Sequence, residues 1–245
     1  MKSFNTQFLR SGVQQNTPRS PHPNLLTNLK GWFQTVRGTT AFLTILFDES
    51  GNLAPIDALS LSLLESPAFE LAIADMKTDP AIATIIAERY MAPPHNLEQL
   101  RQLPPESLGY AYAQHLQQTG FEPIMAEIRI TSDVSYVEYR WQQTHDIWHI
   151  ITGFSTSEIG EMGLQAFYLA QFRLPLSSLL IANALISATV LKPEALSPLL
   201  TAIAQGWELG QTAQPLLAQK WEEAWEKPVA TWQQELNIPT GNIRQ

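Results

Sequence analysis

The stretch His145-Asp146-Ile147-Trp148-His149, with Glu161 after eleven further residues, decides how the rest of the chain is interpreted. Residues four apart on an α-helix lie on the same face, one turn apart, so a helix here would present His145 and His149 side by side. Imidazole nitrogen and carboxylate oxygen are the ligands that borderline divalent cations such as Zn²⁺ take. The spacing therefore predicts a metal site formed by His145, Asp146, His149 and Glu161.

The flanking residues predict the helix that carries this stretch. Thr131 or Ser132 can cap its start, and Gly153 is typical of a helix end. Apolar residues repeat at helical spacing between these points, which places both histidines on the apolar face. An unpaired imidazole is costly there. The motif alone thus leaves two interpretations: metal ligands, or hydrogen-bonded core histidines beside a surface glutamate.

A second helix is expected to begin at the capping box Ser155-x-x-Glu158. In this interpretation Glu158 has a structural role at the helix start. Glu161 lies one turn further along and is free to meet a metal ion. Glu158 is the substitute ligand if one of the four predicted ligands is wrong.

The flanking sequence favours the metal interpretation. From Tyr136 to Pro175, the segment YVEYRWQQTHDIWHIITGF…GEMGLQAFYLAQFRLP resembles the fourth family of ubiquinone (coenzyme Q) biosynthesis proteins, whose signature is HDxxH, eleven residues, then Glu. Weaker similarities cover most of the chain after about residue 75, up to Ile238. One departure is clear: Gln142 and Gln143 stand where the family usually carries Arg and Glu.

The resemblance implies a late step in ubiquinone assembly, at the ring carbon that loses its carboxylate and gains oxygen. A divalent cation, Zn²⁺ first and Mg²⁺, Fe or Co as alternatives, could polarise a ring carboxylate or hydroxyl. Asp146 and Glu161 are then the catalytic candidates of a metal-dependent lyase or oxidative decarboxylase. The family is also regarded as a scaffold for quinone-synthesis enzymes on a membrane, which leaves a binding role as the alternative. A closed four-ligand site favours structure, and three ligands plus water favour catalysis.

Two other classes share parts of the motif. Phosphohydrolases with an HD doublet need another upstream His and a distant Asp, but the order and flanks of His115 and Asp133 do not fit that pattern. Zinc proteases carry Glu after the first His, because the longer side chain reaches the attacking water. Both classes are disfavoured.

An uncharged segment, Leu174 to Leu191, lies between Arg173 and Lys192. Its Ser, Asn and Thr residues favour a buried helix over a membrane span. We expect one helix from Glu161 to Leu191 to line an apolar cavity for an isoprenoid chain, with the metal site at its mouth. The predicted lipid-binding residues are Trp141, Trp148, Met162, Gln165, Leu169, Leu180 and Ala184.

The rest of the chain is predicted to form further helices, because the alternation of apolar and polar residues that is typical of strands is never sustained. The prediction is an all-α, single-domain bundle of about ten helices with an internal apolar cavity. It would span residues 24–245 and follow a loose polar arm at residues 1–23, which lacks the apolar core of a signal peptide. Other expected helices cover 24–47 with a break near Gly38, 56–64, 67–77, 80–90, 107–118, 193–209, 212–226 and 228–237.

The amino-acid composition limits the classes of partner that the chain can bind. A formal net charge of −8 argues against a nucleic-acid binder, which needs a basic face. The chain has no cysteine, which excludes disulfides and thiolate ligands. Hydrophobic residues make up 44% and charged residues only 16%, so we expect a homodimer in the cytoplasm or peripherally on a membrane, with no transmembrane span. The expected partners are a prenylated quinone precursor or isoprenoid lipid and other quinone-biosynthesis proteins.

The residues Trp221, Trp225 and Trp232 share one helical stripe, which could belong to the core or form a partner face.

Overall fold

The computed structural model describes residues 37–45, 54–120 and 129–240. Within these ranges the protein is a single all-α domain, which confirms the predicted fold class. The described ranges contain no strand, and their one isolated β-bridge joins Ser107 to Pro228. The predicted arm at residues 1–23 lies outside the described residues, as does most of the segment 24–47 apart from a helix at 37–45 that includes Gly38.

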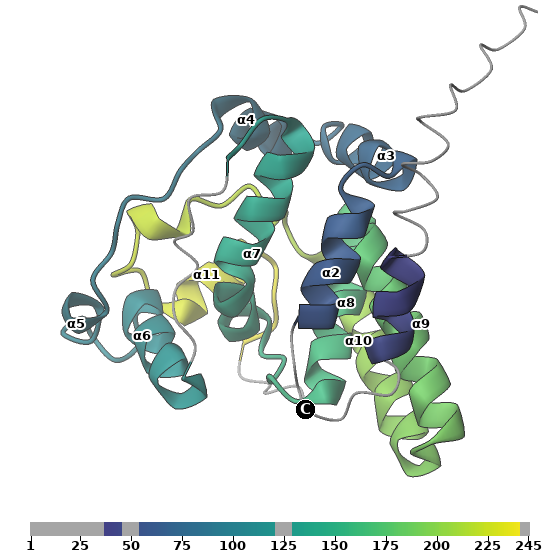
Figure 1. The fold of residues 1–245 in the computed structure, drawn as a ribbon. Coiled ribbons are helices and arrows are strands. Elements are labelled where there is room, and N and C mark those ends of the chain that lie inside the picture. The colour runs from purple at the N-terminus through teal and green to yellow at the C-terminus, as the bar shows by residue number, and fades with distance from the viewer. Residues whose placement is uncertain (1–36, 46–53, 121–128, 241–245) are drawn as a thin grey trace, which may run out of the picture.

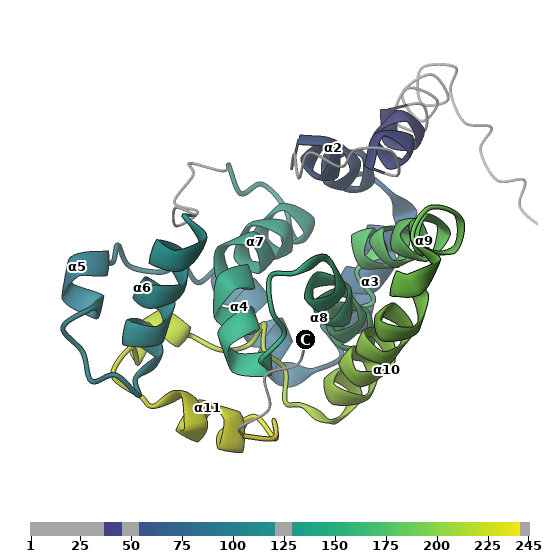
Figure 2. The same ribbon diagram turned by 90° about the horizontal axis from the view of Figure 1, so that it is seen from below.

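The helix at 37–45 is followed by α2 (Ala54–Leu63), α3 (Pro67–Met76), α4 (Pro80–Glu88), α5 (Leu97–Leu100), α6 (Leu108–Thr119), α7 (Asp133–Thr152), α8 (Glu158–Phe172), α9 (Pro175–Val190), α10 (Leu196–Thr212) and α11 (Val229–Glu235). Two short 3₁₀ helices, η1 (Pro193–Ala195) and η2 (Trp221–Glu223), lie among them. Seen from below, α7 lies between α6 and α8, and α9 and α10 cover the far side of α8 (Figure 2).

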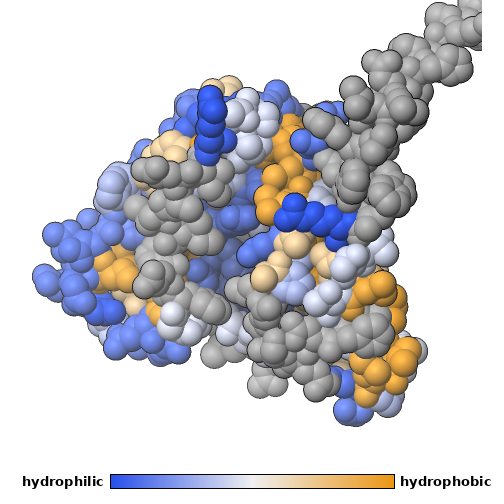
Figure 3. Space-filling view, in the orientation of Figure 1, coloured by the Kyte–Doolittle hydropathy of each residue, from blue (hydrophilic) through white to orange (hydrophobic). Residues whose placement is uncertain are grey.

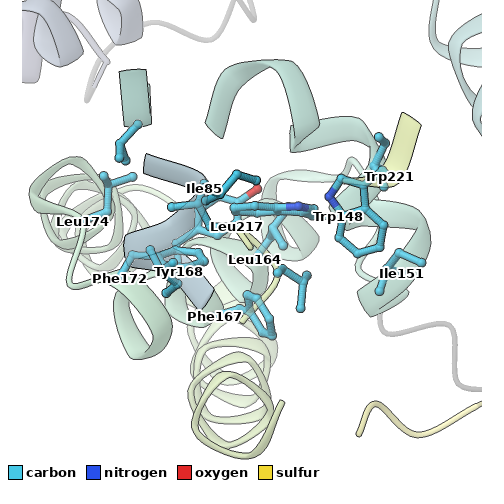
Figure 4. Packing of buried hydrophobic residues seen from close by; sticks show 14 of the residues in the cluster. Ile85, Trp148, Ile151, Leu164, Phe167, Tyr168, Phe172, Leu174, Leu217 and Trp221 are labelled. Carbon is cyan, nitrogen blue, oxygen red and sulfur yellow. The ribbon is translucent and has the colours of Figure 1, made fainter. Parts of the chain in front are cut away.

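The core forms where α7 faces α8. Trp148 of α7 stacks on Phe172 with ring centroids 5.3 Å apart, and it meets Tyr168 edge-on at 5.0 Å. Figure 4 shows these rings beside Leu164 and Phe167, which lie on α8 with Tyr168 and Phe172. On its opposite side α8 packs against α10 almost backbone to backbone, because a side chain on Gly206 would collide with the carbonyl of Gly163. Thus α8 is held firmly on two sides.

The caps of α7 agree with the sequence. The Ser132 hydroxyl accepts a hydrogen bond from the Ser135 N–H, and the Ser135 hydroxyl in turn accepts from the Ser132 N–H. The helix ends at Gly153, whose φ of 78° lies in the left-handed region that glycine tolerates. The predicted capping box of α8 is wrong: Ser157 is the cap and accepts from the Gly160 N–H, whereas Glu158 is simply the first helical residue.

The expected single helix from Glu161 to Leu191 is two helices. Arg173 has a φ of 49° and ends α8, and Pro175 opens α9. Proline has no N–H to continue the ladder of α8, and it disfavours helical geometry at the residue before it. The chain therefore turns back, and α9 packs against α8 (Figure 1). The ion pair of Lys192 with Glu158, at 3.6 Å, brings the end of α9 to the start of α8.

The expected helix at 212–226 is also wrong. α10 ends at Thr212, and the following segment, which contains Pro215, has no helix before η2. Trp221, Trp225 and Trp232 are buried, with 0%, 9% and 5% of their surface exposed. They are core residues rather than a partner face.

A buried ion pair ties α7 to this C-terminal segment. Arg140 donates from Nη1 to Glu222 Oε1 at 2.6 Å and from Nη2 to Glu222 Oε2 at 3.0 Å. It also donates to Gln143 Oε1 at 2.9 Å and to the Gln219 carbonyl at 2.8 Å. Gln143, one of the departures from the resembled family, thus has a neutral acceptor role in this network.

Removing one partner of this pair should destabilise the fold strongly. Glu222→Ala would leave the Arg140 guanidinium buried without its counter-charge, so we expect a loss of about 3–5 kcal/mol in the free energy of unfolding. The control is Glu88→Ala, which breaks the exposed Lys220–Glu88 pair nearby and should change stability far less, because solvent screens the pair. Urea unfolding compares the two variants, and equal losses would contradict the assignment.

A buried carboxyl predicts a pH effect. Glu138 of α7 accepts hydrogen bonds from Ser60 of α2 and from Gln142. Burial raises its pKa more than these bonds lower it, and the charge of Asp57 raises it further. The folded state therefore binds the proton more tightly than the unfolded state, and stability is lost as pH rises above the unfolded value of about 4.3.

Glu138→Gln should remove this loss, because the amide carries no charge and its oxygen can still accept both bonds. We expect the variant to gain stability over the parent chain between pH 4 and pH 7. Urea unfolding at both pH values measures the difference, which would be constant with pH if Glu138 did not titrate.

Candidate metal-binding site

Two imidazoles and one carboxylate converge between α7 and α8. His149 Nε2 lies 3.0 Å from Glu161 Oε1, and His145 Nε2 lies 3.7 Å from Glu161 Oε2. The two Nε2 atoms are 3.1 Å apart. One ligand atom from each residue lies within 4.8 Å of the other two, and no other such group of three occurs in the part of the chain that the structure describes. Three of the four predicted ligands are therefore brought together.

The Nδ1 atom of each histidine, on the side of the ring away from Glu161, also has a hydrogen-bond partner. His149 Nδ1 lies 2.9 Å from the Phe154 carbonyl, which can only accept, so Nδ1 carries a proton and Nε2 is the nitrogen that faces Glu161. His145 Nδ1 lies 2.8 Å from the Tyr168 hydroxyl. Metal-ligating histidines are usually anchored in this way through the second ring nitrogen. Tyr168 and the Phe154 carbonyl were not identified from the sequence, since only the folded turn and helix packing bring them here.

The donor set fits a small divalent cation. Bonds of about 2.0–2.1 Å from a tetrahedral Zn²⁺ place neighbouring ligand atoms about 3.3 Å apart. The two Nε2 atoms lie 3.1 Å apart and His149 Nε2 lies 3.0 Å from Glu161 Oε1, both close to that value, while His145 Nε2 lies 3.7 Å from the other oxygen, Oε2. Two histidines and one glutamate leave a coordination position for water or substrate, as in catalytic rather than structural zinc sites.

The electrostatics of the site favour a charged carboxylate. Burial alone would raise the pKa of Glu161, but hydrogen bonds and charge from His145 and His149 outweigh it and hold the pKa well below its usual range. Burial likewise lowers the pKa of His149, yet the Glu161 contact reverses this and raises it. Glu161 is thus an ionised oxygen donor at neutral pH.

Asp146 and Glu158 do not join this cluster. Asp146 Oδ1 lies 3.2 Å from Nε2 of His115 on α6, a residue that the sequence motif did not place beside the site. Glu158 has a side chain that is 86% exposed and faces Lys192, so it does not take a ligand's place.

The predicted lipid-binding residues lie in three settings. Trp141 sits edge-on to His145 with ring centroids 5.9 Å apart, beside the site itself. Trp148 and Leu180 are buried, and Gln165 is buried with its amide oxygen accepting from Ser177 at 2.8 Å. The partly exposed members are Met162, Leu169 and Ala184.

The fold and the site together define an all-helical protein with a two-histidine, one-glutamate candidate metal site. Residues 56–241 match the family model described as coenzyme Q (ubiquinone) biosynthesis protein Coq4. The chain therefore belongs to the Coq4 family, as the resemblance in sequence indicated.

Relatives agree with this assignment. The mitochondrial ubiquinone biosynthesis protein COQ4 homolog of Bos taurus is 32% identical over 69% of this chain and 65% of its own length. The Aedes aegypti homolog is 29% identical over 58% of this chain and 53% of its own length. The chain thus spans about half to two thirds of these relatives. The crystal structure of a candidate ubiquinone biosynthesis protein from Nostoc punctiforme PCC 73102 superposes with a TM-score of 0.75 and 30% identity, over 82% of this chain and 97% of that one.

Substitution of the three converging residues should remove metal binding. We expect His145→Ala and His149→Ala each to abolish stoichiometric Zn²⁺ binding, and Glu161→Gln to weaken it by about 100-fold or more, since even the loss of an outer contact costs about 10–100-fold. Glu158→Gln is the control and should retain full occupancy. Metal analysis after chelation and re-addition gives the result, and full occupancy in both histidine variants would rule out the ligand assignment.

Proposed function

We propose that this chain is a metal-binding and prenyl-lipid-binding protein that acts on a prenylated aromatic ring in quinone biosynthesis, at the decarboxylation and hydroxylation of one ring carbon. The observation that carries the proposal is the convergence of His145 Nε2, His149 Nε2 and the Glu161 carboxylate, with both rings anchored from behind. Membership of a family described as ubiquinone biosynthesis proteins supports the proposed class of substrate.

In this proposal the three side chains hold a divalent cation, with Zn²⁺ favoured by the donor set and Mg²⁺, Fe or Co as alternatives. When bound, the cation supplies Lewis-acid polarisation of a ring carboxylate or hydroxyl. The site remains reachable, because the side chains of His145 and Glu161 are 26% and 29% exposed. Zn²⁺ is redox-inactive and cannot accept electrons from the ring. An oxidative step would therefore need a redox-active metal bound by the same ligands or an external oxidant.

The isoprenoid tail is proposed to lie along α8 and α9. Met162 follows Glu161 directly, and Ala184 lies on α9, whose end reaches the start of α8 through the Lys192–Glu158 pair. Each methylene removed from water there contributes about 0.8 kcal/mol, so a long prenyl chain can anchor a substrate whose polar ring lies at the metal.

The alternative function is a scaffold that binds isoprenoid lipid and organises quinone-biosynthesis proteins on a membrane. Apolar surface supports an association of this kind: Figure 3 shows hydrophobic residues gathered over the adjoining ends of α9 and α10. The exposed apolar residues of these two helices and the link between them are Ile186, Val190, Leu191, Leu200 and Trp207. A second copy of the chain or a membrane surface are the proposed partners. No helix among the described residues has the length and apolarity to cross a bilayer.

Turnover separates the two functions. The purified, metal-loaded chain is incubated with a prenylated hydroxybenzoate and an oxidant, and release of CO₂ is measured. Release that is lost in Glu161→Gln supports catalysis. Tight prenyl-lipid binding without release supports the scaffold.

A bulky residue on α9 should test the lipid site. Ala184→Trp is expected to abolish prenyl-lipid binding while leaving metal occupancy intact, because the indole would fill the proposed path of the chain. In a close-packed core the same change would instead lower stability by about 1–3 kcal/mol. Thr189→Trp, at an exposed position of the same helix, is the control. Mass spectrometry measures the lipid bound to each variant. A folded, metal-loaded Ala184→Trp variant that still carried lipid would refute the proposed path of the prenyl chain.

A further inference from the structure

One face of α7 stays open beside the candidate metal site. Between Tyr136 and His149 the residues of α7 are buried, apart from four that keep some exposed surface: Trp141, Gln142, His145 and Asp146. Residues at this spacing share one face of a helix. Figure 3 shows the surface hollowed beside α7, with hydrophilic side chains in the recess. A ring bound next to His145 would therefore lie against this face.

The side-chain amide of Gln142 has a fixed direction on this face. Its Nε2 donates to Glu138 Oε1 at 2.8 Å, and the same carboxyl oxygen accepts from the Ser60 hydroxyl of α2. Glu138 and Ser60 are buried, with 7% and 4% of their surface exposed. A flipped amide would place two oxygens against each other, so the nitrogen stays on Glu138 and Oε1 points away from it.

The fold makes no use of this amide oxygen. Within the part of the chain that the structure describes, no group donates a hydrogen bond to Gln142 Oε1. The two other glutamines near the site differ, because Gln143 Oε1 accepts from Arg140 and Gln165 Oε1 accepts from Ser177. Gln142 thus has a spare acceptor three residues before His145, about 4.5 Å along the helix axis. An acceptor of this kind suits a hydroxyl group, which can donate.

Trp141 makes the same face suitable for an aromatic ring. Its indole meets the rings of His145 and Tyr168 edge-on, with centroids 5.9 and 5.8 Å away. These two contacts hold the indole in place while part of its surface stays exposed. Aromatic rings prefer edge-to-face or offset contacts with one another. A ring beside His145 can therefore contact Trp141 with its face or edge and Gln142 with a polar substituent.

We infer that Gln142 is a specificity-determining residue whose Oε1 accepts a hydrogen bond from a free hydroxyl on the aromatic ring of the substrate, an inference that rests on the function proposed above. It narrows the substrate class to rings that carry a hydroxyl as well as a prenyl chain. A ring without the hydroxyl would leave Oε1 shielded from water and without a donor, which costs binding free energy.

Binding of two matched compounds tests this role. Calorimetry measures the Kd of the Zn²⁺-loaded full chain for a geranylated para-hydroxybenzoate and for the same compound without its hydroxyl group. The parent chain should bind the hydroxyl compound about tenfold more tightly, as expected for one hydrogen bond. Gln142→Met has a similar length and no acceptor oxygen, so it should bind the two compounds about equally and keep full metal occupancy. Gln205→Met, at an exposed position of α10, is the control and should keep the tenfold preference.

Two results would overturn the inference alone. One is equal binding of the two compounds by the parent chain, a measurement that needs no variant to fold. The other is an undiminished preference in Gln142→Met, which would mean that another group recognises the hydroxyl. A parent chain that bound neither compound would instead overturn the proposed prenyl-ring binding, and this inference with it.

Discussion

The hydrogen bond between His149 Nδ1 and the Phe154 carbonyl joins the end of α7 to the turn that leads into α8. It is possible because Gly153 adopts a positive φ and reverses the chain within one residue. Phe154 then inserts its buried ring beneath Gly163, where a larger residue would collide with it. One short turn thus sets the direction of an imidazole, the start of the next helix and, through that helix, the position of Glu161.

α7 is central in the fold and yet carries many polar groups inward. Arg140 meets Glu222 of the C-terminal segment, Glu138 meets Ser60 of α2, and His145 meets Tyr168 of α8. Buried polar groups are costly without partners, so each of them accepts only a narrow range of neighbours. The helices around α7 are therefore placed by matched donors and acceptors as well as by apolar contact.

The sequence was sufficient for the parts of the fold that depend on local chemistry. The bounds of α7 follow from a serine cap and a terminal glycine, and the all-α class follows from helical spacing without alternation. Prediction from the sequence was wrong where two local signals competed for the same helix boundary. Ser157 displaced Ser155 as the cap of α8, and Pro175 divided a continuous apolar segment into α8 and α9.

In the site, the spacing of the motif was enough to predict that His145, His149 and Glu161 converge. It could not reveal the direction of Asp146 around the helix relative to its neighbours, because that depends on whether α6 or α8 lies on each side of α7. His115 and Tyr168 come from helices far from the motif in sequence. Such contacts arise from packing alone, and a single sequence has no local pattern that marks them.

For the proposed metal site, the close contact of α8 with α10 bears on the size of the ion that would fit. Gly206 leaves no room between α10 and the backbone at Gly163, two residues from Glu161. The backbone that carries Glu161 therefore cannot move toward α10 to make room for a larger ion. Flexible sites adjust to Ca²⁺, whereas rigid ones discriminate by radius and geometry. In the proposed metal site, a glycine on a helix that contributes no ligand would thereby narrow the range of ions that α7 and α8 could hold.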